Sequence, residues 1–165
     1  MKQNPTAGEV WAASDELETT TATLLGRLVF AFSRLDVALG LCLVWAGDGR
    51  QIGALTPRVT AMTFHKKLDQ LAELVEAKFV AGSKKRSGWA RWIEDAHKTR
   101  ALRNQLTHGR WGVDPYTDDA INVIGLPTSP NQHEIRYSPK ALSDAVIEAI
   151  QLQTKLSQLR EQWPV

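Results

Sequence analysis

The spacing of apolar residues is the feature that most limits what this chain can fold into. Apolar residues recur every three or four positions in four segments, which are separated by stretches containing glycine or proline. This period matches the turn of an α-helix, so each segment can bury one face against the others. The pattern therefore predicts a mainly α protein, a four-helix bundle.

The first predicted helix begins at Ser14, which can cap it, and ends near Ala46, before a glycine-rich turn. Residues 1–13 are then expected to form a flexible N-terminal tail, and residues 14–165 a single helical domain. The second half of this helix is apolar on more than one face. This indicates burial on several sides or a partner helix from another subunit.

Three further helices are predicted at about 56–81, 88–107 and 138–163. The first of them opens on a threonine followed by proline, and the last on a serine followed by proline, which are helix-start signals. Residues 110–137 differ, because they hold three prolines and short β-favouring runs. They predict a small β-hairpin or meander inserted before the last helix.

Composition excludes several classes of protein. The chain has 165 residues, 43% of them hydrophobic, which is enough to bury a core. A single cysteine, Cys42, excludes an intrachain disulfide and a multi-cysteine zinc site. No apolar leader follows Met1, and the most apolar stretch, 24–46, carries charges that are costly in lipid. We therefore expect a cytoplasmic protein without a membrane partner.

Charge is unevenly distributed along the chain. The net charge is only +2, but residues 84–110 hold eight basic and two acidic residues. A basic segment on a mildly acidic body is typical of a surface that meets a phosphate-bearing partner. The alternative is a solvated helix face followed by a basic loop.

Common catalytic and metal motifs are absent from the sequence. It contains no phosphate-binding P-loop, no dinucleotide fingerprint, no nucleophile elbow and no His-Glu-x-x-His zinc motif. Glu94 and His97 form one Glu-x-x-His, but a di-iron site on a helical bundle needs a second from another helix. Cys42 lies in an apolar stripe, where a structural thiol is expected. We predict no metal and no cofactor.

One cluster remains, at the end of the helix predicted at 88–107. Arg103, Asn104 and His108 follow each other within six residues, beside Gly109. The motif and the helical architecture resemble the HEPN domains, helical-bundle proteins of bacterial defence and toxin systems and of RNA processing, whose mark is Arg, a polar residue and then His. The pairs Arg58–His65 and Arg91–His97 also have a fitting spacing, but an apolar residue follows each arginine.

The resemblance implies a homodimer that cuts RNA without a metal, as a toxin or defence effector with an antitoxin or regulatory protein as a possible partner. It implies Arg103, Asn104 and His108 as the active site. Nearby basic residues are expected to steer RNA, and Trp111 could stack on a base. The predicted RNA-binding residues are Lys84, Lys85, Arg86, Arg100, Arg110 and Trp111.

The chemistry of such a cut suits these residue types. The 2′-hydroxyl attacks phosphorus, one group takes its proton, and one group protonates the leaving oxygen. Histidine suits both proton transfers, and arginine suits the charge that builds on phosphorus. One domain offers one such histidine, so a composite site across a two-fold dimer would supply two.

Two alternatives stay open. Arg103 could tie its helix to a neighbour's carbonyls, and His108 could stabilise the helix end through the helix dipole. The chain would then be a catalytically inactive helical dimer that regulates or binds a protein or ligand. Exposure of Arg103 and His108 in a shared basic cleft would favour the enzyme, and burial against neighbours the regulator.

Overall fold

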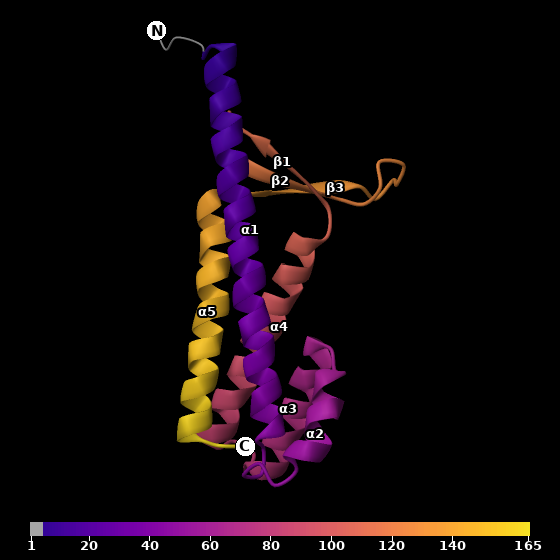
Figure 1. Ribbon diagram of the computed structural model, residues 1–165, viewed down its shortest axis with the longest axis vertical. Coiled ribbons are helices and arrows are strands. Elements are labelled where there is room, and N and C mark those ends of the chain that lie inside the picture. Colours follow the sequence, from indigo (N-terminus) through magenta and orange to yellow (C-terminus); the bar gives the residue numbers. More distant parts are fainter. Residues whose placement is uncertain (1–4) are drawn as a thin grey trace. The chain divides into compact units, whose positions relative to one another are not determined.

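The computed structural model describes residues 5–165, and Figure 1 shows the order of their helices and strands. Five helices and three strands form in this range: α1 (Ala7–Val44), α2 (Ile52–Thr60), α3 (Phe64–Lys78), α4 (Lys84–Thr107), β1 (Arg110–Asp114), β2 (Asp119–Ile124), β3 (His133–Tyr137) and α5 (Pro139–Gln162). The predicted fold class is confirmed, mainly helical with a small antiparallel sheet before the last helix. None of the helices within residues 5–165 has the length and apolar character that a membrane crossing needs.

Helix α1 begins before the predicted Ser14. The Thr6 hydroxyl accepts a hydrogen bond from the Glu9 amide (3.3 Å), and the Glu9 carboxylate accepts one from the Thr6 amide (2.7 Å). This reciprocal pair is a capping box, which satisfies amides that a helix start leaves open. The bond from the Thr6 amide also lowers the pKa of the Glu9 carboxyl. Residues 7–13 of the predicted tail are therefore helical, and residues 1–4 lie outside the described residues.

The segment predicted as one helix at 56–81 forms two helices. Thr63 has an extended backbone, and its side chain accepts a hydrogen bond from the Lys66 amide (3.4 Å). It therefore acts as the N-cap of α3 and separates this helix from α2. Pro57 lies inside α2 rather than at its first position.

Serine caps fix the starts of the two remaining helices. Ser83 accepts a hydrogen bond from the Arg86 amide, so α4 begins at Lys84, a turn earlier than the predicted start near residue 88. Ser138 accepts one from the Ala141 amide (3.2 Å), as the Ser-Pro signal predicted for α5.

The described residues divide into two compact units. Residues 5–29 and 103–147 form one, called here the strand unit, and residues 30–102 and 148–165 form the other, called the helical unit. Helices α1, α4 and α5 each contribute to both units, whereas the sheet belongs to the strand unit and α2 and α3 belong to the helical unit.

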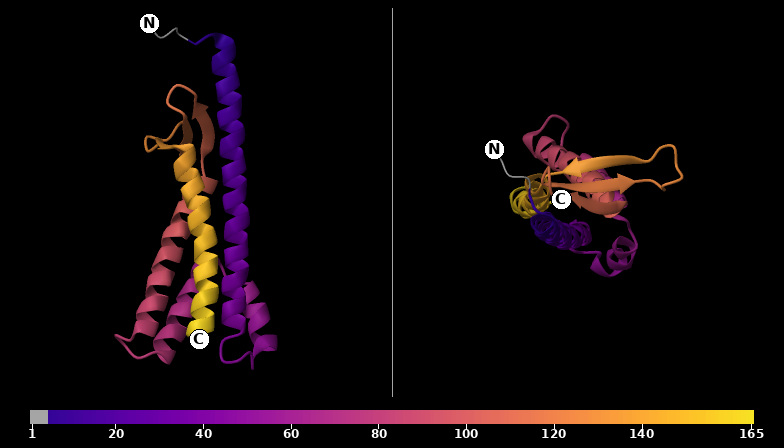
Figure 2. Two further views of the ribbon diagram at one scale, coloured as in Figure 1. Left: turned by 90° about the vertical axis from the view of Figure 1, so that its left-hand side faces the viewer. Right: turned by 90° about the horizontal axis from the view of Figure 1, so that it is seen from above.

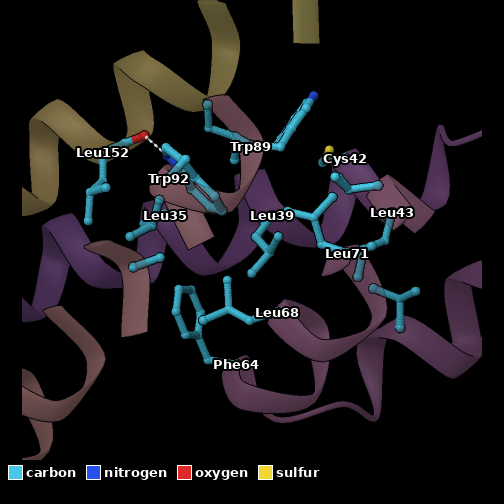
Figure 3. Close-up of a cluster of buried hydrophobic side chains, with 14 of the residues drawn as sticks. Leu35, Leu39, Cys42, Leu43, Phe64, Leu68, Leu71, Trp89, Trp92 and Leu152 are labelled. Atoms are coloured by element: carbon cyan, nitrogen blue, oxygen red, sulfur yellow. Dashed lines mark hydrogen bonds between the residues drawn. The ribbon is translucent and has the colours of Figure 1, made fainter. Parts of the chain in front are cut away.

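The helical unit has a core of large apolar side chains (Figure 3). The large apolar residues with no exposed surface in this unit are Leu35, Leu39, Leu68, Leu71 and Trp89. The buried indole of Trp92 donates from Nε1 to the Leu152 carbonyl (2.9 Å), so its polar atom has a partner in the core. Cys42 is also buried, which raises the pKa of its thiol to about 11, as a structural thiol requires.

The strand unit contains the sheet, in the order β1-β2-β3 (Figure 2). Trp111 pairs with Asn122, and Asn122 pairs with Ile135, so these three side chains share one face. Arg136 lies on the opposite face, where its Nη1 donates to an Asp114 carboxylate oxygen (3.0 Å). This bond is the main reason why the pKa of the Asp114 carboxyl is lowered.

Candidate functional site

The C-terminal end of α4 is capped by side chains from the sheet. The Asn122 amide nitrogen donates to the carbonyls of Gln105 (3.0 Å) and His108 (3.2 Å). The Trp111 indole nitrogen donates to the Leu106 carbonyl (3.1 Å). The last carbonyls of a helix have no donor within the helix, so Asn122 and Trp111 supply the missing hydrogen-bond donors. They fix the backbone that carries the predicted motif.

Gly109 makes this cap possible. Its φ of 126° lies in a region that residues with a Cβ avoid. A Cβ at this position would also collide with the Asn122 side-chain oxygen. The buried Asn122 side chain must pass close to Gly109 to reach the end of α4. A glycine directly after His108 is therefore explained by the structure of the cap.

Arg103 and Asn104 contact each other in the last turns of α4. The Arg103 Nη1 donates to the Asn104 side-chain oxygen at 3.2 Å, and both residues are half-buried. The Thr107 hydroxyl donates to the carbonyls of both (3.0 and 3.2 Å). The Asn104 side chain is therefore in direct contact with the guanidinium group of Arg103.

His108 follows the last helical residue, Thr107, and its side chain is exposed. The His108 amide still donates to the Asn104 carbonyl (3.1 Å), so His108 is held at the end of α4 and the chain leaves the helix directly after it. The carbonyl end of a helix carries partial negative charge, which favours a nearby cation such as the exposed Arg110.

The Trp111 side chain contacts both the sheet and the end of α4. Its ring lies 5.7 Å from the Tyr137 ring, between centroids, while its nitrogen bonds to the Leu106 carbonyl. The side chain is half-buried, and burial also raises the pKa of the Tyr137 hydroxyl. A role for Trp111 in stacking on RNA bases stays a prediction.

The predicted site residues fall into two groups. Those in the strand unit all lie at the end of α4 or the start of β1: Arg103, Asn104, His108, Arg110 and Trp111. Those in the helical unit are Lys84, Lys85, Arg86 and Arg100. Lys84, Lys85 and Arg86 occupy the first turn of α4, and Arg86 forms an ion pair with Glu76 (3.2 Å).

A cluster outside the predicted site was missed by the sequence analysis. His65 and Asp69 of α3 and His97 of α4 offer ligand atoms that all lie within 4.8 Å of one another. His65 and His97 are the histidines of the two rejected Arg-to-His pairs. The i,i+4 spacing of His65 and Asp69 on one helix was the available signal. Glu94, which the sequence considered with His97, instead forms an ion pair with Lys98 (2.7 Å).

The surroundings of His97 favour its neutral form. Burial has the largest effect in lowering the pKa of its imidazole, and the positive charges of His65 and Arg100 act in the same direction. The Asp69 carboxylate opposes them.

Comparisons of the chain with known protein families, with curated proteins and with solved structures found no match. The geometry of the site and the motif therefore carry the functional argument.

Proposed function

We propose that this chain is a metal-independent endoribonuclease of the HEPN type, with a composite active site across a homodimer, and that it acts as a toxin or defence effector. The observation that carries the proposal is the arrangement at the end of α4. The side chains of Arg103 and Asn104 are hydrogen-bonded to each other there, and the exposed His108 follows directly after the helix.

The arrangement supplies the groups that the reaction needs. The 2′-hydroxyl oxygen attacks the adjacent phosphorus, and the bond from phosphorus to the 5′-oxygen breaks. The products are a 2′,3′-cyclic phosphate and a 5′-hydroxyl. His108 takes the proton of the nucleophile or gives one to the leaving oxygen, the two roles that histidine serves in general acid–base catalysis. Arg103, oriented by Asn104, stabilises the charge on the phosphoryl oxygens.

The reaction needs two proton transfers, but one copy of the chain offers one histidine at this site. A second copy of the chain would supply a second His108. The described part of α1 offers an apolar stripe to such a copy. Three members lie on one face of the helix and are between 48% and 69% exposed: Phe30, Val37 and Leu41. Trp45, which is 52% exposed, follows directly after the last residue of α1. Contiguous exposed apolar surface is typical of protein interfaces.

The test is RNA cleavage by the purified protein in excess EDTA, with analysis of the product ends. We expect cleavage that leaves 2′,3′-cyclic phosphate ends. Arg103→Ala and His108→Ala should each reduce the cleavage rate by at least about 100-fold, as expected when a group that acts in the transition state is lost. Arg103→Lys keeps the charge without the planar fork and is expected to recover only part of the activity. Matched controls are Arg91→Ala and His133→Ala, both exposed residues outside the site.

Three outcomes would contradict the proposal. They are cleavage that EDTA abolishes, cleavage unchanged in the Arg103 and His108 variants, and no cleavage by a folded protein over a broad RNA set. The last outcome would favour the inactive regulator instead. The paired substitution Phe30→Glu and Leu41→Glu tests the dimer: analytical ultracentrifugation should then find a monomer with little activity.

A further inference from the structure

Two histidines and a carboxylate meet on the surface of the helical unit. His65 lies in the first turn of α3, Asp69 lies one turn later, and His97 comes from α4. The His65 Nε2 atom is 3.7 Å from an Asp69 oxygen, and the rings of His65 and His97 are 5.3 Å apart between centroids. The ligand atoms of all three lie within 4.8 Å of one another.

These distances are close to those of a metal site. Ligand atoms around a tetrahedral zinc ion are roughly 3.3 Å apart, given bonds of about 2.0–2.1 Å. The side chains therefore need to approach one another by about 1.5 Å at most. His65 and Asp69 have side chains that are more than half exposed, so they can rotate without disturbing the core.

The donor set selects the class of ion. Calcium and magnesium prefer sites made of oxygen ligands, whereas imidazole nitrogen suits zinc and other divalent transition metals. Two histidines and one carboxylate leave a fourth position open to water, as in zinc sites with three protein ligands. Arg100 adds a positive charge near His97, which the Asp69 carboxylate opposes to a smaller extent.

We propose that His65, Asp69 and His97 bind one divalent transition-metal ion of the zinc class, with water in the remaining position. The ion joins the start of α3 to α4 within the helical unit. The site is independent of the proposed ribonuclease activity, because none of its three ligands belongs to the candidate active site.

The experiment adds Zn²⁺ to metal-free protein and follows binding by calorimetry and stability by thermal unfolding. We expect one ion per chain and a midpoint that rises by about 5–10 °C at a zinc concentration roughly 100 times the dissociation constant. Co²⁺ in place of Zn²⁺ is expected to give visible absorption bands typical of nitrogen and oxygen ligands.

Variants assign the ligands. His65→Ala, Asp69→Asn and His97→Ala are each expected to weaken zinc binding by at least about 100-fold, since even outer-shell losses cost 10–100-fold. His133→Ala removes an exposed histidine of β3 and should leave binding unchanged. Circular dichroism without zinc checks that each variant folds. The proposal is overturned if no one-to-one binding occurs, or if the His65 and His97 variants bind zinc as the unmodified protein does.

Discussion

The helical unit and the strand unit are stabilised by different means. The helical unit buries large apolar side chains from α1, α3 and α4. The described part of the strand unit buries Leu17, Leu28, Leu106 and Leu142, but it also buries the polar Asn122 without any exposed surface. Apolar burial is non-directional, whereas the bonds of Asn122 require a fixed geometry.

This difference bears on where chemistry can occur. A core of packed leucines offers few polar groups, but a helix end capped by a buried amide presents its neighbouring side chains in a defined orientation. The candidate catalytic residues Arg103 and His108 belong to the second kind of environment. Substitutions in each unit test whether the two units differ in this way.

The largest effect is expected from the helical unit. Trp89→Ala removes a side chain with no exposed surface and also its hydrogen bond to the Trp163 carbonyl (3.1 Å). We expect a loss of about 3–5 kcal/mol in the free energy of unfolding, measured by urea denaturation. Trp11→Ala is the matched control, because Trp11 is 78% exposed. A Trp89 variant as stable as the Trp11 variant would refute an apolar core centred on Trp89.

A smaller effect is expected from the cap in the strand unit. Asn122→Ala leaves the Gln105 and His108 carbonyls without their donors, which costs about 1–3 kcal/mol. The last turn of α4 should then exchange its amide hydrogens faster, as measured by NMR or mass spectrometry.

Asn131→Ala is the matched control for the cap, since Asn131 is exposed in the loop between β2 and β3. It should change stability by less than about 0.5 kcal/mol. Equal effects of the two asparagine substitutions would mean that the helix end does not depend on the sheet.

The smallest effect is expected on the outer face of the sheet. Arg136→Ala removes the main cause of the lowered Asp114 pKa, so this pKa should rise towards its ordinary value of 3.8. A lowered pKa stabilises the fold above that ordinary value, and this contribution is lost as the pH falls through the lowered pKa. In the Arg136 variant this loss at low pH should largely disappear.

NMR titration of the Asp114 carboxyl carbon measures the change. Glu134→Ala is the control, because it removes another partner of Arg136 (3.1 Å) but keeps the bond to Asp114. An Asp114 pKa that stays lowered without Arg136 would instead assign the shift to the bonds from Tyr116 and Thr117.

The helices were largely predictable because their apolar period is a local property. Several boundaries were not read correctly, among them the starts of α1, α3 and α4, although the signals were present. Thr6 with Glu9 is a capping box, and Thr63 is an N-cap residue ahead of an apolar stripe. The strand insertion followed from its prolines and β-favouring runs, but its register depends on pairing between distant residues.

The candidate site was predicted in part. The contact of Arg103 with Asn104 is between neighbours in sequence, and the exit from the helix follows from Gly109. The role of Asn122 could not be predicted, because its bonds reach back 14 and 17 residues along the chain. The meeting of His65 with His97 likewise requires the packing of α3 on α4.

The cap by Asn122 has a consequence for the order in which the protein matures on the ribosome. Residues of α4 and His108 are synthesised before those of β2. The Gln105 and His108 carbonyls therefore have no hydrogen-bond donor from Asn122 until that residue has left the ribosomal exit tunnel. A nascent chain stalled before that residue lacks the finished end of α4. The hydrogen bonding at the end of α4, where His108 lies, is therefore completed only after β2 has been synthesised.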